Sequence, residues 1–484
     1  MRINYQPISN VTGVLMVLLG LSMFLTAAVS YYNAGSDFKD FLISGGITIV
    51  TGALLWFSKF SSSTIVNKRE GYLIVAMGWV FLGFFGALPF MLSGVTTNFA
   101  DAFFESVSGF TTTGASIFTD IESLPPGILF WRSMTHWIGG MGIIVLTVAL
   151  FPLLGIAGIE LFVAESPGPT ADKVHPRIKE TAKRLWFIYF GLTMTLFFLL
   201  WWQGMSLFDA INHAFATMGT GGFSTKNASI AHFTSPGIHY TIILFMFIAG
   251  CNYAILYYLF KGRFSKVWIN EEFRYYTLFI LLTSLVLGLW INYMTGGSYE
   301  ENFRNGLFML VSLITTTGFV TADYTQWSPG LTMFFFLTLF LGACAGSTAG
   351  GIKFIRHMVF VKNMYLEFKR ILHPRALIRI KINKEIVAPR ILTHILVFLL
   401  VYLMTFIMGS LFITLTGIDF ITAIGGCATT LGNVGPAIGK LGPVDNFGWV
   451  PDSAKWIFSV LMLLGRLELF TILIIFTPFF WRSN

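Results

Sequence analysis

Long apolar stretches, separated by short polar connections, dominate the chain from one end to the other. An α-helix needs about 20 mostly apolar residues to cross the hydrocarbon core of a bilayer. The first stretch is longer than the apolar core of a signal peptide and lacks a convincing cleavage site, so it is interpreted as a retained span. The pattern predicts an all-α polytopic membrane protein with ten such stretches, near residues 11–32, 43–60, 73–93, 129–155, 185–203, 239–260, 275–295, 331–349, 391–416 and 456–480.

The composition excludes the soluble classes. Of the 484 residues, 55% are hydrophobic and 11% are charged, whereas soluble domains have about 25% charged residues. The three cysteines, Cys251, Cys344 and Cys427, stand singly, and no pair of histidines or cysteines has the spacing of a metal site. The net charge of +8 does not indicate nucleic-acid binding, because membrane proteins gather Lys and Arg in their cytoplasmic loops.

The basic residues predict the orientation of the chain. Four connections hold 22 of the 31 Lys and Arg residues, and the four connections that alternate with them hold only Lys226, Arg304 and Lys440. The positive-inside rule places the first set, and with it both termini, in the cytoplasm. The basic connections are 59–72, 156–184, 261–274 and 353–390, and the outer connections are 94–128, 204–238, 296–330 and 417–454.

The four outer connections share a sequence pattern. Each contains a helix-like segment in which an Asp or Asn precedes a glycine by 13 residues, and each lies between two predicted spans. We interpret the first residue of each segment as the N-cap of a short helix. Residues 73–480 are therefore predicted to contain four copies of a helix, a re-entrant half-helix with its loop, and a second helix. The segments begin at Asp101, Asp209, Asn305 and Asp419 and end at Gly114, Gly222, Gly318 and Gly432.

Loops of this kind have a chemistry of their own inside a membrane. Irregular backbone at that depth must line water or be buried in protein. Backbone carbonyls and Thr hydroxyls can replace the hydration shell of a monovalent cation, and glycine allows the backbone to turn its carbonyls toward one axis. The partial negative charge at the C-terminus of each half-helix also favours a cation. The repeated loops thus indicate a cation pathway.

Several motifs resemble one known group of transporters. The sequence His-Trp-Ile-Gly-Gly-Met-Gly at 136–142, the sequence Ala-Glu-Ser-Pro-Gly-Pro at 164–169 and the two extra spans before residue 73 are similar to the Trk, Ktr and HKT superfamily of K+ transporters. The membrane subunit of the bacterial Trk system is the nearest in kind. The resemblance covers nearly the whole chain and implies four tandem helix–pore-loop–helix units in fourfold pseudosymmetry around one pore. The implied division is 1–72 for two N-terminal transmembrane helices and 73–172, 173–263, 264–374 and 375–484 for the four pore units.

The resemblance also implies which residues form a selectivity filter. A serine at the first filter position accompanies Na+ selectivity in the plant branch, so Gly114 favours K+. The second and fourth loops depart from the Thr-Thr-x-Gly pattern through Gly219, Gly221 and Leu431, and we expect four unequal loops to allow some passage of Rb+ or Na+. The implied K+-binding residues are Thr112, Thr113, Gly114, Thr220, Gly221, Gly222, Thr316, Thr317, Gly318, Thr430, Leu431 and Gly432.

Two further features are assigned to a gate by the resemblance. Small residues interrupt the second helix of the third unit at 338–353, where the family has an intramembrane loop under the filter; close helix packing is the alternative interpretation. A P-loop is not indicated, because the Gly-Lys-Ser/Thr sequence is absent. Arg466 lies inside the last span, at a cost of at least about 2.5–3.5 kcal/mol, and either faces the pore or pairs with Glu468. The gate residues are Gly346, Ser347, Thr348, Gly350, Gly351, Lys353 and Arg466.

The function that follows is K+ uptake across the bacterial inner membrane by a protein that is not an enzyme and carries no cofactor, with K+ as the transported ion. The resemblance implies a homodimer in membrane lipid and a cytoplasmic, nucleotide-binding regulatory partner of the TrkA type. A K+ symporter coupled to H+ or Na+ is the alternative. Glu468 is the only acidic residue expected in mid-membrane among the pore-forming helices, which weakens the case for a proton relay. An enzyme or receptor site at the outer loops would need a nucleophile and a base, and the loops offer Thr and Gly instead.

Overall fold

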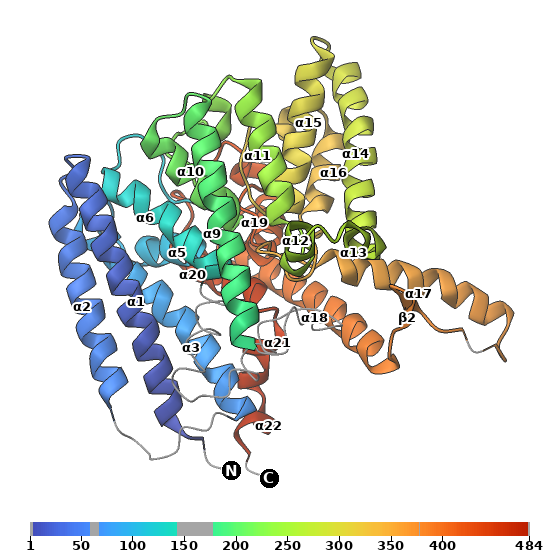
Figure 1. Ribbon diagram of the computed structural model, residues 1–484, viewed down its shortest axis with the longest axis horizontal. Coiled ribbons are helices and arrows are strands. Elements are labelled where there is room, and N and C mark those ends of the chain that lie inside the picture. The colour runs from blue at the N-terminus through green and yellow to red at the C-terminus, as the bar shows by residue number, and fades with distance from the viewer. Residues whose placement is uncertain (1–2, 59–66, 143–177, 377, 483–484) are drawn as a thin grey trace.

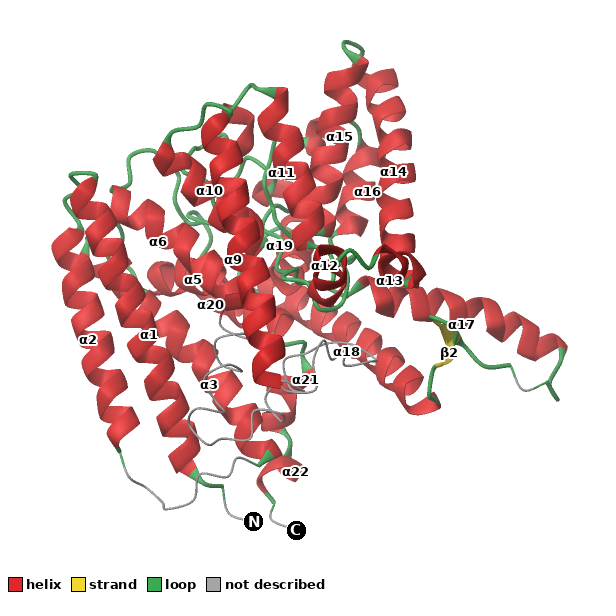
Figure 2. Ribbon diagram, viewed as in Figure 1, coloured by secondary structure: helices red, strands yellow, loops and turns green. Residues whose placement is uncertain are grey.

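The computed structural model describes residues 3–58, 67–142, 178–376 and 378–482. Within these ranges the chain is helical apart from turns, loops and one two-stranded hairpin (Figures 1 and 2). The all-α fold predicted from the apolar stretches is confirmed. The motif at 164–169, most of the basic connection 156–184 and the end of the predicted span 129–155 lie outside the described residues.

Two long helices precede the repeated part of the chain. Helices α1 (Tyr5–Tyr32) and α2 (Phe38–Phe57) lie side by side at one edge of the molecule (Figure 1). Helix α1 packs on α3 (Lys68–Gly86) and on α6 (Pro126–Trp137). The α1–α2 pair therefore packs against the first pore unit at the edge of the helical bundle.

Four units of helix, short pore helix and second helix follow. The first comprises α3, α5 (Phe99–Phe110) and α6, which continues as the π-helix η1 (Ile138–Gly142). The second unit comprises α9 (Ile178–Trp202), α10 (Leu207–Gly219), α11 (Pro236–Ala249) and α12 (Tyr253–Phe260). The third comprises α14 (Glu271–Thr295), α15 (Tyr299–Ile314) and α16 (Pro329–Thr338). The fourth comprises α18 (Pro389–Thr414), α19 (Phe420–Gly432), α20 (Asp452–Arg466) and α21 (Phe470–Leu473).

The remaining elements are short connections, apart from one long helix. Helix α17 (Phe354–Leu372) and the hairpin of β1 (Lys381–Ile382) and β2 (Glu385–Ile386) project from one side of the molecule (Figure 1). The hairpin is antiparallel, with Lys381 opposite Ile386. The short elements are α4 (Leu88–Leu92), η2 (Ser229–His232), α13 (Phe264–Ile269), η3 (Tyr324–Gln326), η4 (Gly439–Leu441), η5 (Ile474–Phe476) and α22 (Pro478–Trp481).

The second helix is interrupted in the second, third and fourth units, whereas the sequence indicated a break in the third unit only. The predicted break in the third unit is present, because α16 ends at Thr338 and residues 339–353 are not helical. The second and fourth units are also bent, by 108° between α11 and α12 and by 107° after α20. Asn252 caps the restarted helix α12, and Glu468 and Leu469 adopt positive φ at the bend after α20.

These breaks explain the number of continuous spans. Among the described residues, six helices are long and apolar enough to cross a membrane, or up to eight if each bent pair forms one span. Of the ten predicted stretches, the one at 129–155 runs beyond the described residues, and the one at 331–349 is cut short at Thr338.

The N-caps of the pore helices differ from the prediction. The residues that precede the four pore helices are Asn98, Ser206, Ser298 and Asp419. Only the predicted cap Asp419 is correct. Asp101 and Asp209 lie inside the first turn of their helices, and Asn305 lies in the middle of α15. Acidic side chains are favourable in a first turn as well as at an N-cap, so residue type alone did not separate the two positions.

Candidate functional site

The four pore helices end in the same backbone motif. At each C-terminus one residue adopts the left-handed conformation, with φ of 56° at Thr112, 55° at Thr220, 53° at Thr316 and 53° at Asn433. The N–H group of the next residue donates to the carbonyl five positions earlier, over 2.8–3.0 Å, in all four helices. This is the Schellman arrangement, which satisfies the last carbonyls of a helix. The four loops are therefore repeats of one structure.

A glycine follows each left-handed residue by two positions and has positive φ itself: Gly114, Gly222, Gly318 and Gly435. We call the segments 112–114, 220–222, 316–318 and 433–435 ring segments 1 to 4.

The four ring segments close into a cycle. A Cβ atom built on Gly114 would lie 2.0 Å from the carbonyl oxygen of Gly221 in ring segment 2. The equivalent contact runs from Gly222 to Thr317 O at 2.1 Å and from Gly318 to Val434 O at 2.2 Å. Gly435 closes the cycle against Thr113 O at 2.7 Å. Any side chain at a ring glycine would thus occupy the place of a neighbouring carbonyl.

The fourth segment corrects the alignment made from sequence. The pattern placed Gly432 in register with Gly114, but α19 continues to Gly432 and the matching glycine is Gly435. The sequence alignment was wrong by three residues. The predicted residues Thr430, Leu431 and Gly432 end the pore helix, and their place in the ring is taken by Asn433, Val434 and Gly435. The nine predicted residues of the first three loops do lie together in the ring.

Three threonines are held in a backbone conformation that β-branched residues rarely adopt. Left-handed φ at such a residue costs about 1–3 kcal/mol. Thr112, Thr220 and Thr316 are fully buried. The Thr112 hydroxyl accepts a hydrogen bond from Arg466, and the Thr316 hydroxyl accepts one from the Gly350 N–H group at 2.7 Å. At the equivalent position Asn433 donates to the Thr113 hydroxyl at 3.0 Å, which joins ring segment 4 to ring segment 1.

The non-helical residues 339–353, which we call the intramembrane segment, pack against ring segments 3 and 4. Besides the hydrogen bond to Thr316, a Cβ atom on Gly350 would lie 2.8 Å from both the Gly432 carbonyl oxygen and the Asn433 Cβ. Of the predicted gate residues, Gly350 therefore contacts ring segments 3 and 4, and Thr348 contacts Arg466. Gly346 and Ser347 lie farther along, where the Gly346 carbonyl accepts from Tyr253 N at 3.1 Å and the Ser347 hydroxyl donates to Cys344 O.

Two charged residues hold the intramembrane segment in place. The buried Glu272 carboxylate, at the start of α14, accepts N–H groups of Ala345 at 2.8 Å and Ile355 at 3.2 Å. Lys353 is buried and its ammonium group donates to the Ala349 carbonyl. Glu272 thereby ties Ala345 of the segment to the first turn of α17, and Lys353 forms its bond within the segment.

Arg466 lies at the end of α20 and joins the ring to the intramembrane segment. Its Nη1 donates to the Thr112 hydroxyl at 3.1 Å and to the Thr348 carbonyl at 2.8 Å. Its Nη2 donates to the carbonyls of Gly139 at 2.6 Å and Gly140 at 2.8 Å. Glu468, the alternative partner considered from sequence, instead forms an ion pair with Arg356.

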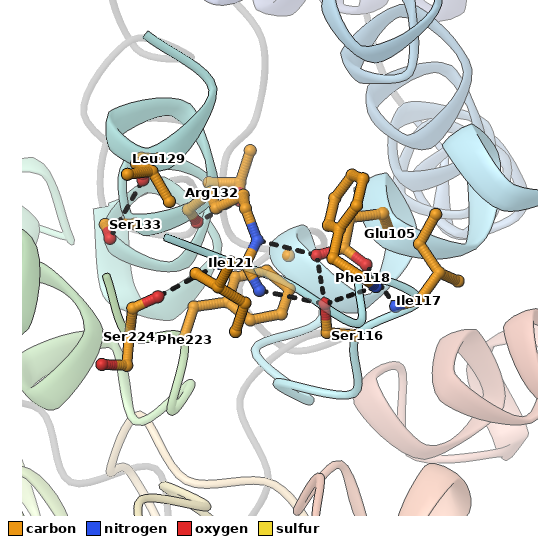
Figure 3. A network of polar contacts seen from close by, with 12 residues as sticks. Glu105, Ser116, Ile117, Phe118, Ile121, Leu129, Arg132, Ser133, Phe223 and Ser224 are labelled. Carbon is orange, nitrogen blue, oxygen red and sulfur yellow. Dashed lines mark hydrogen bonds and ion pairs between the residues drawn. The ribbon is translucent and has the colours of Figure 1, made fainter. Parts of the chain in front are cut away.

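A buried ion pair that no sequence motif indicated lies behind the ring. Glu105 on α5 is completely buried, and its carboxylate lies 2.8 Å from Nε of Arg132 on α6 (Figure 3). Glu468 was the only acidic residue expected in mid-membrane among the pore-forming helices, and Glu105 is a further acidic side chain of a pore helix that is fully buried. Glu105 and Arg132 are 27 residues apart on different helices, and only the acidic residue inside an apolar helix pattern could have drawn attention to the pair.

His136 accounts for the departure of the second loop from the threonine pattern. The Nδ1–H of its ring donates to the Gly109 carbonyl at 2.8 Å, and its Nε2 accepts the N–H of Phe223 at 3.2 Å. A Cβ atom on Gly221 would lie 2.2 Å from the His136 ring. Gly221 replaces a threonine there because the imidazole occupies the space of a side chain.

The arrangement defines a class of protein. Four short helices direct their negative C-terminal ends toward one closed ring of carbonyl oxygens, inside a bundle of apolar helices, as expected for a membrane protein that passes a cation. Among the described residues no group of three or more His, Cys, Asp or Glu side chains could hold a metal ion, so backbone oxygens are the ligands on offer.

Comparison with known proteins gives the family. Residues 38–483 match the family TrkH, cation transport protein, and the chain belongs to this family. It is 41% identical to the Trk system potassium uptake protein TrkH of Escherichia coli K12, over 99% of this chain and all of that protein. It is 33% identical to TrkG of the same organism, over 99% of both chains. The crystal structure of the potassium transporter TrkH from Vibrio parahaemolyticus superposes with a TM-score of 0.88 at 36% identity, covering 99% of this chain and 100% of that one.

Proposed function

We propose that this protein takes up K+ across the bacterial inner membrane through the ring of four segments. The observation that carries the proposal is the closed cycle in which each ring glycine faces a carbonyl oxygen of the next segment. Such a cycle supplies oxygens at one depth from four directions, as replacing the hydration shell of K+ requires. Relatives of similar length are potassium uptake proteins.

The driving force in this proposal is electrical. An inside-negative potential contributes about 2.3 kcal/mol per charge per 100 mV, so a passive pathway accumulates K+ without ATP hydrolysis. The C-terminal ends of α5, α10, α15 and α19 lower the energy of the partly dehydrated ion in the ring.

The intramembrane segment and Arg466 form the gate of the proposed pathway. The segment contacts two ring segments through Gly350, and Arg466 contacts both Thr112 and the Thr348 carbonyl. The positive charge of Arg466 opposes the movement of a cation from the ring toward the intramembrane segment. Movement of the segment would break these contacts together and open the pathway.

The setting of the pathway belongs to the same proposal. In this proposal α17 and both termini lie in the cytoplasm, which the basic connections favour, and the two termini lie at the same end of the molecule (Figure 1). We further propose that the protein is a homodimer in the lipid bilayer and that a cytoplasmic nucleotide-binding subunit of the TrkA type regulates it. The four pore units are proposed to divide at residues 72, 172, 263 and 374.

Uptake without a coupled ion is favoured over symport with H+ or Na+. The Glu105 carboxylate is already committed to Arg132 and two further donors, so it is unsuited to carry a proton. Reversal potentials in liposomes distinguish the two modes. A fixed shift with a pH or Na+ gradient would establish coupling, and a potential that follows K+ alone would establish the passive pathway.

Growth of a strain that lacks K+ uptake tests the proposal directly. The wild-type chain, expressed with a Trk regulatory subunit, should restore growth on limiting K+, and Gly114→Ser should fail or admit Na+. Gly94→Ser is the matched control, because Gly94 has a similar φ of 72° but open space around its Cβ position. Failure of correctly inserted wild-type protein to restore growth would contradict the proposed function.

A further inference from the structure

The polar network behind ring segments 1 and 2 reaches both of them from one pair of residues. The Glu105 carboxylate accepts the Ser116 hydroxyl at 3.0 Å on one oxygen and the Ile117 N–H at 2.9 Å on the other. Ser116 and Ile117 directly follow the ring glycine Gly114 and Ala115. Glu105 therefore fixes the chain where it leaves ring segment 1 (Figure 3).

Arg132 carries the same network to ring segment 2. Its Nη1 donates to the Ser224 carbonyl at 3.2 Å, its Nη2 donates to the Ser116 hydroxyl at 3.1 Å, and its guanidinium lies 4.0 Å from the centre of the Phe223 ring. Phe223 and Ser224 directly follow the ring glycine Gly222. The planar guanidinium has the donors in a fixed fork that such a bridge between two chains requires.

The fold does not need charges at this position. Glu105 precedes its ring glycine by nine residues, and the residues at the same place in the other pore helices are His213, Met309 and Gly426. Two of the four repeats thus build the same loop over an apolar side chain or none. A buried ion pair is costly to desolvate and is often replaceable by apolar residues without loss of stability, so its presence in one repeat calls for another reason.

We propose that the Glu105–Arg132 pair is a positioning element that holds ring segments 1 and 2 at a fixed separation and thereby sets the preference for K+ over Na+. Neither side chain touches the ion. Each acts through the backbone that follows a ring glycine, so that the carbonyls of Thr113 and Gly221 keep their spacing against the contraction that a smaller ion favours. The inference rests on the proposed function of the ring as a K+ pathway.

Ion flux into liposomes tests the pair, with K+ and Na+ influx measured on the same preparations of full-length protein. Glu105→Gln keeps the shape but removes the charge, and the ratio of K+ to Na+ influx should fall about tenfold. Ser116→Ala leaves the two charges buried and paired and removes only the hydroxyl that both contact, so it should fold normally. Its flux ratio should fall about threefold.

The ratio separates positioning from mere stability. A variant that only lowers the amount of folded protein reduces both fluxes by one factor and leaves their ratio unchanged. Asp101→Asn is the matched control, because Asp101 lies one turn earlier on α5 and pairs with the buried Lys455, outside the network. Its ratio should equal that of the wild type.

The outcomes distinguish the two proposals. A wild-type protein that prefers K+, with both Glu105→Gln and Ser116→Ala within twofold of its ratio, would overturn the positioning role alone. A wild-type protein that carries no K+ would contradict the proposed function itself. A fall in the ratio for both variants, with Asp101→Asn unchanged, would establish the positioning role.

Discussion

The two halves of the ring have the same backbone but differ in what supports it. Behind ring segments 1 and 2 lie the Glu105–Arg132 ion pair and the His136 imidazole, all buried. Behind ring segments 3 and 4 the hydrogen bonds come from uncharged groups, such as the Ser312 hydroxyl on Phe319 O and the Tyr324 hydroxyl on Ala437 O.

The contacts with the intramembrane segment are also unequal. Gly350 touches ring segments 3 and 4, whereas ring segment 1 is reached through Arg466. The two halves of the ring therefore differ both in the groups that support them and in their contacts with the intramembrane segment. Charge-assisted hydrogen bonds, which are stronger than neutral ones, support ring segments 1 and 2, whereas uncharged groups support ring segments 3 and 4, which the proposed gate contacts.

The largest effect is expected at the ring itself, where the halves should respond alike. Gly222→Ala and Gly435→Ala, one in each half, force a side chain into a positive φ and against a carbonyl oxygen. Strain of this kind, about 1–3 kcal/mol before the overlap is counted, should reduce K+ uptake about a hundredfold in both variants. Uptake of the tracer Rb+ by cells that lack other K+ systems measures it.

Two controls accompany these variants. Gly94→Ala has a similar positive φ in open space and should transport normally. Gly432→Ala tests the register of the fourth loop, because Gly432 ends α19 and lacks positive φ. Its Cβ would lie 2.9 Å from the Leu339 carbonyl oxygen of the intramembrane segment and not against a ring carbonyl, so flux can change but the preference for K+ should be retained. If Gly432→Ala lost K+ selectivity while Gly435→Ala kept it, the alignment made from sequence would be correct, and Gly432 instead of Gly435 would belong to the ring.

A smaller effect, of opposite sign, is expected at Arg466, which links the two halves through the gate. Arg466→Gln removes the positive charge beside Thr112 and weakens the bond to the Thr348 carbonyl. K+ flux in liposomes without any regulatory subunit should rise about tenfold, with the preference for K+ retained because the ring is unchanged. Arg304→Gln is the control, since this buried arginine pairs with Glu300 on its own helix. Unchanged K+ flux in Arg466→Gln would refute the barrier role.

The sequence predicted the repeated architecture better than it predicted the register of each repeat. Alternating apolar and basic segments and the shared spacing from Asp or Asn to Gly aligned three of the loops as the structure has them, and the family resemblance implied their role as K+-binding residues. The fourth was displaced because Asp419 is an N-cap, whereas Asp101 and Asp209 lie in the first turn of their helices, three residues after the N-cap. The spacing of 16 residues from N-cap to ring glycine, shared by Asn98, Ser206 and Asp419, would have aligned it.

What lies behind the ring could not be predicted in the same way. The Glu105–Arg132 pair joins two helices, and Arg132 continues to the Ser224 carbonyl 92 residues away. Such contacts depend on how the units pack, for which local periodicity carries no signal. The close approach of His136 to Gly221 is of the same kind, and it turned an apparent defect of the threonine pattern into a packing requirement.

The smallest effect distinguishes the halves through a single hydroxyl. Thr316→Val and Thr220→Val both keep a β-branched side chain at a left-handed residue, so the backbone strain is the same in each variant. The Thr316 hydroxyl accepts the Gly350 N–H of the intramembrane segment, whereas the Thr220 hydroxyl donates to Gly219 O within its own loop.

Loss of the Thr316 hydroxyl leaves a buried N–H group without its acceptor, at about 1–3 kcal/mol, and this cost falls on the closed position of the intramembrane segment. Thr316→Val should therefore raise K+ flux in the absence of a regulatory subunit about three- to tenfold, and Thr220→Val should leave it at the wild-type level. The two variants are compared in the same liposome assay, with influx scaled to the amount of folded protein. An equal rise of K+ flux in both variants would mean that the hydrogen bond from Gly350 to Thr316 does not hold the intramembrane segment closed. The proposed difference between ring segments 1 and 2 and ring segments 3 and 4 would then be wrong.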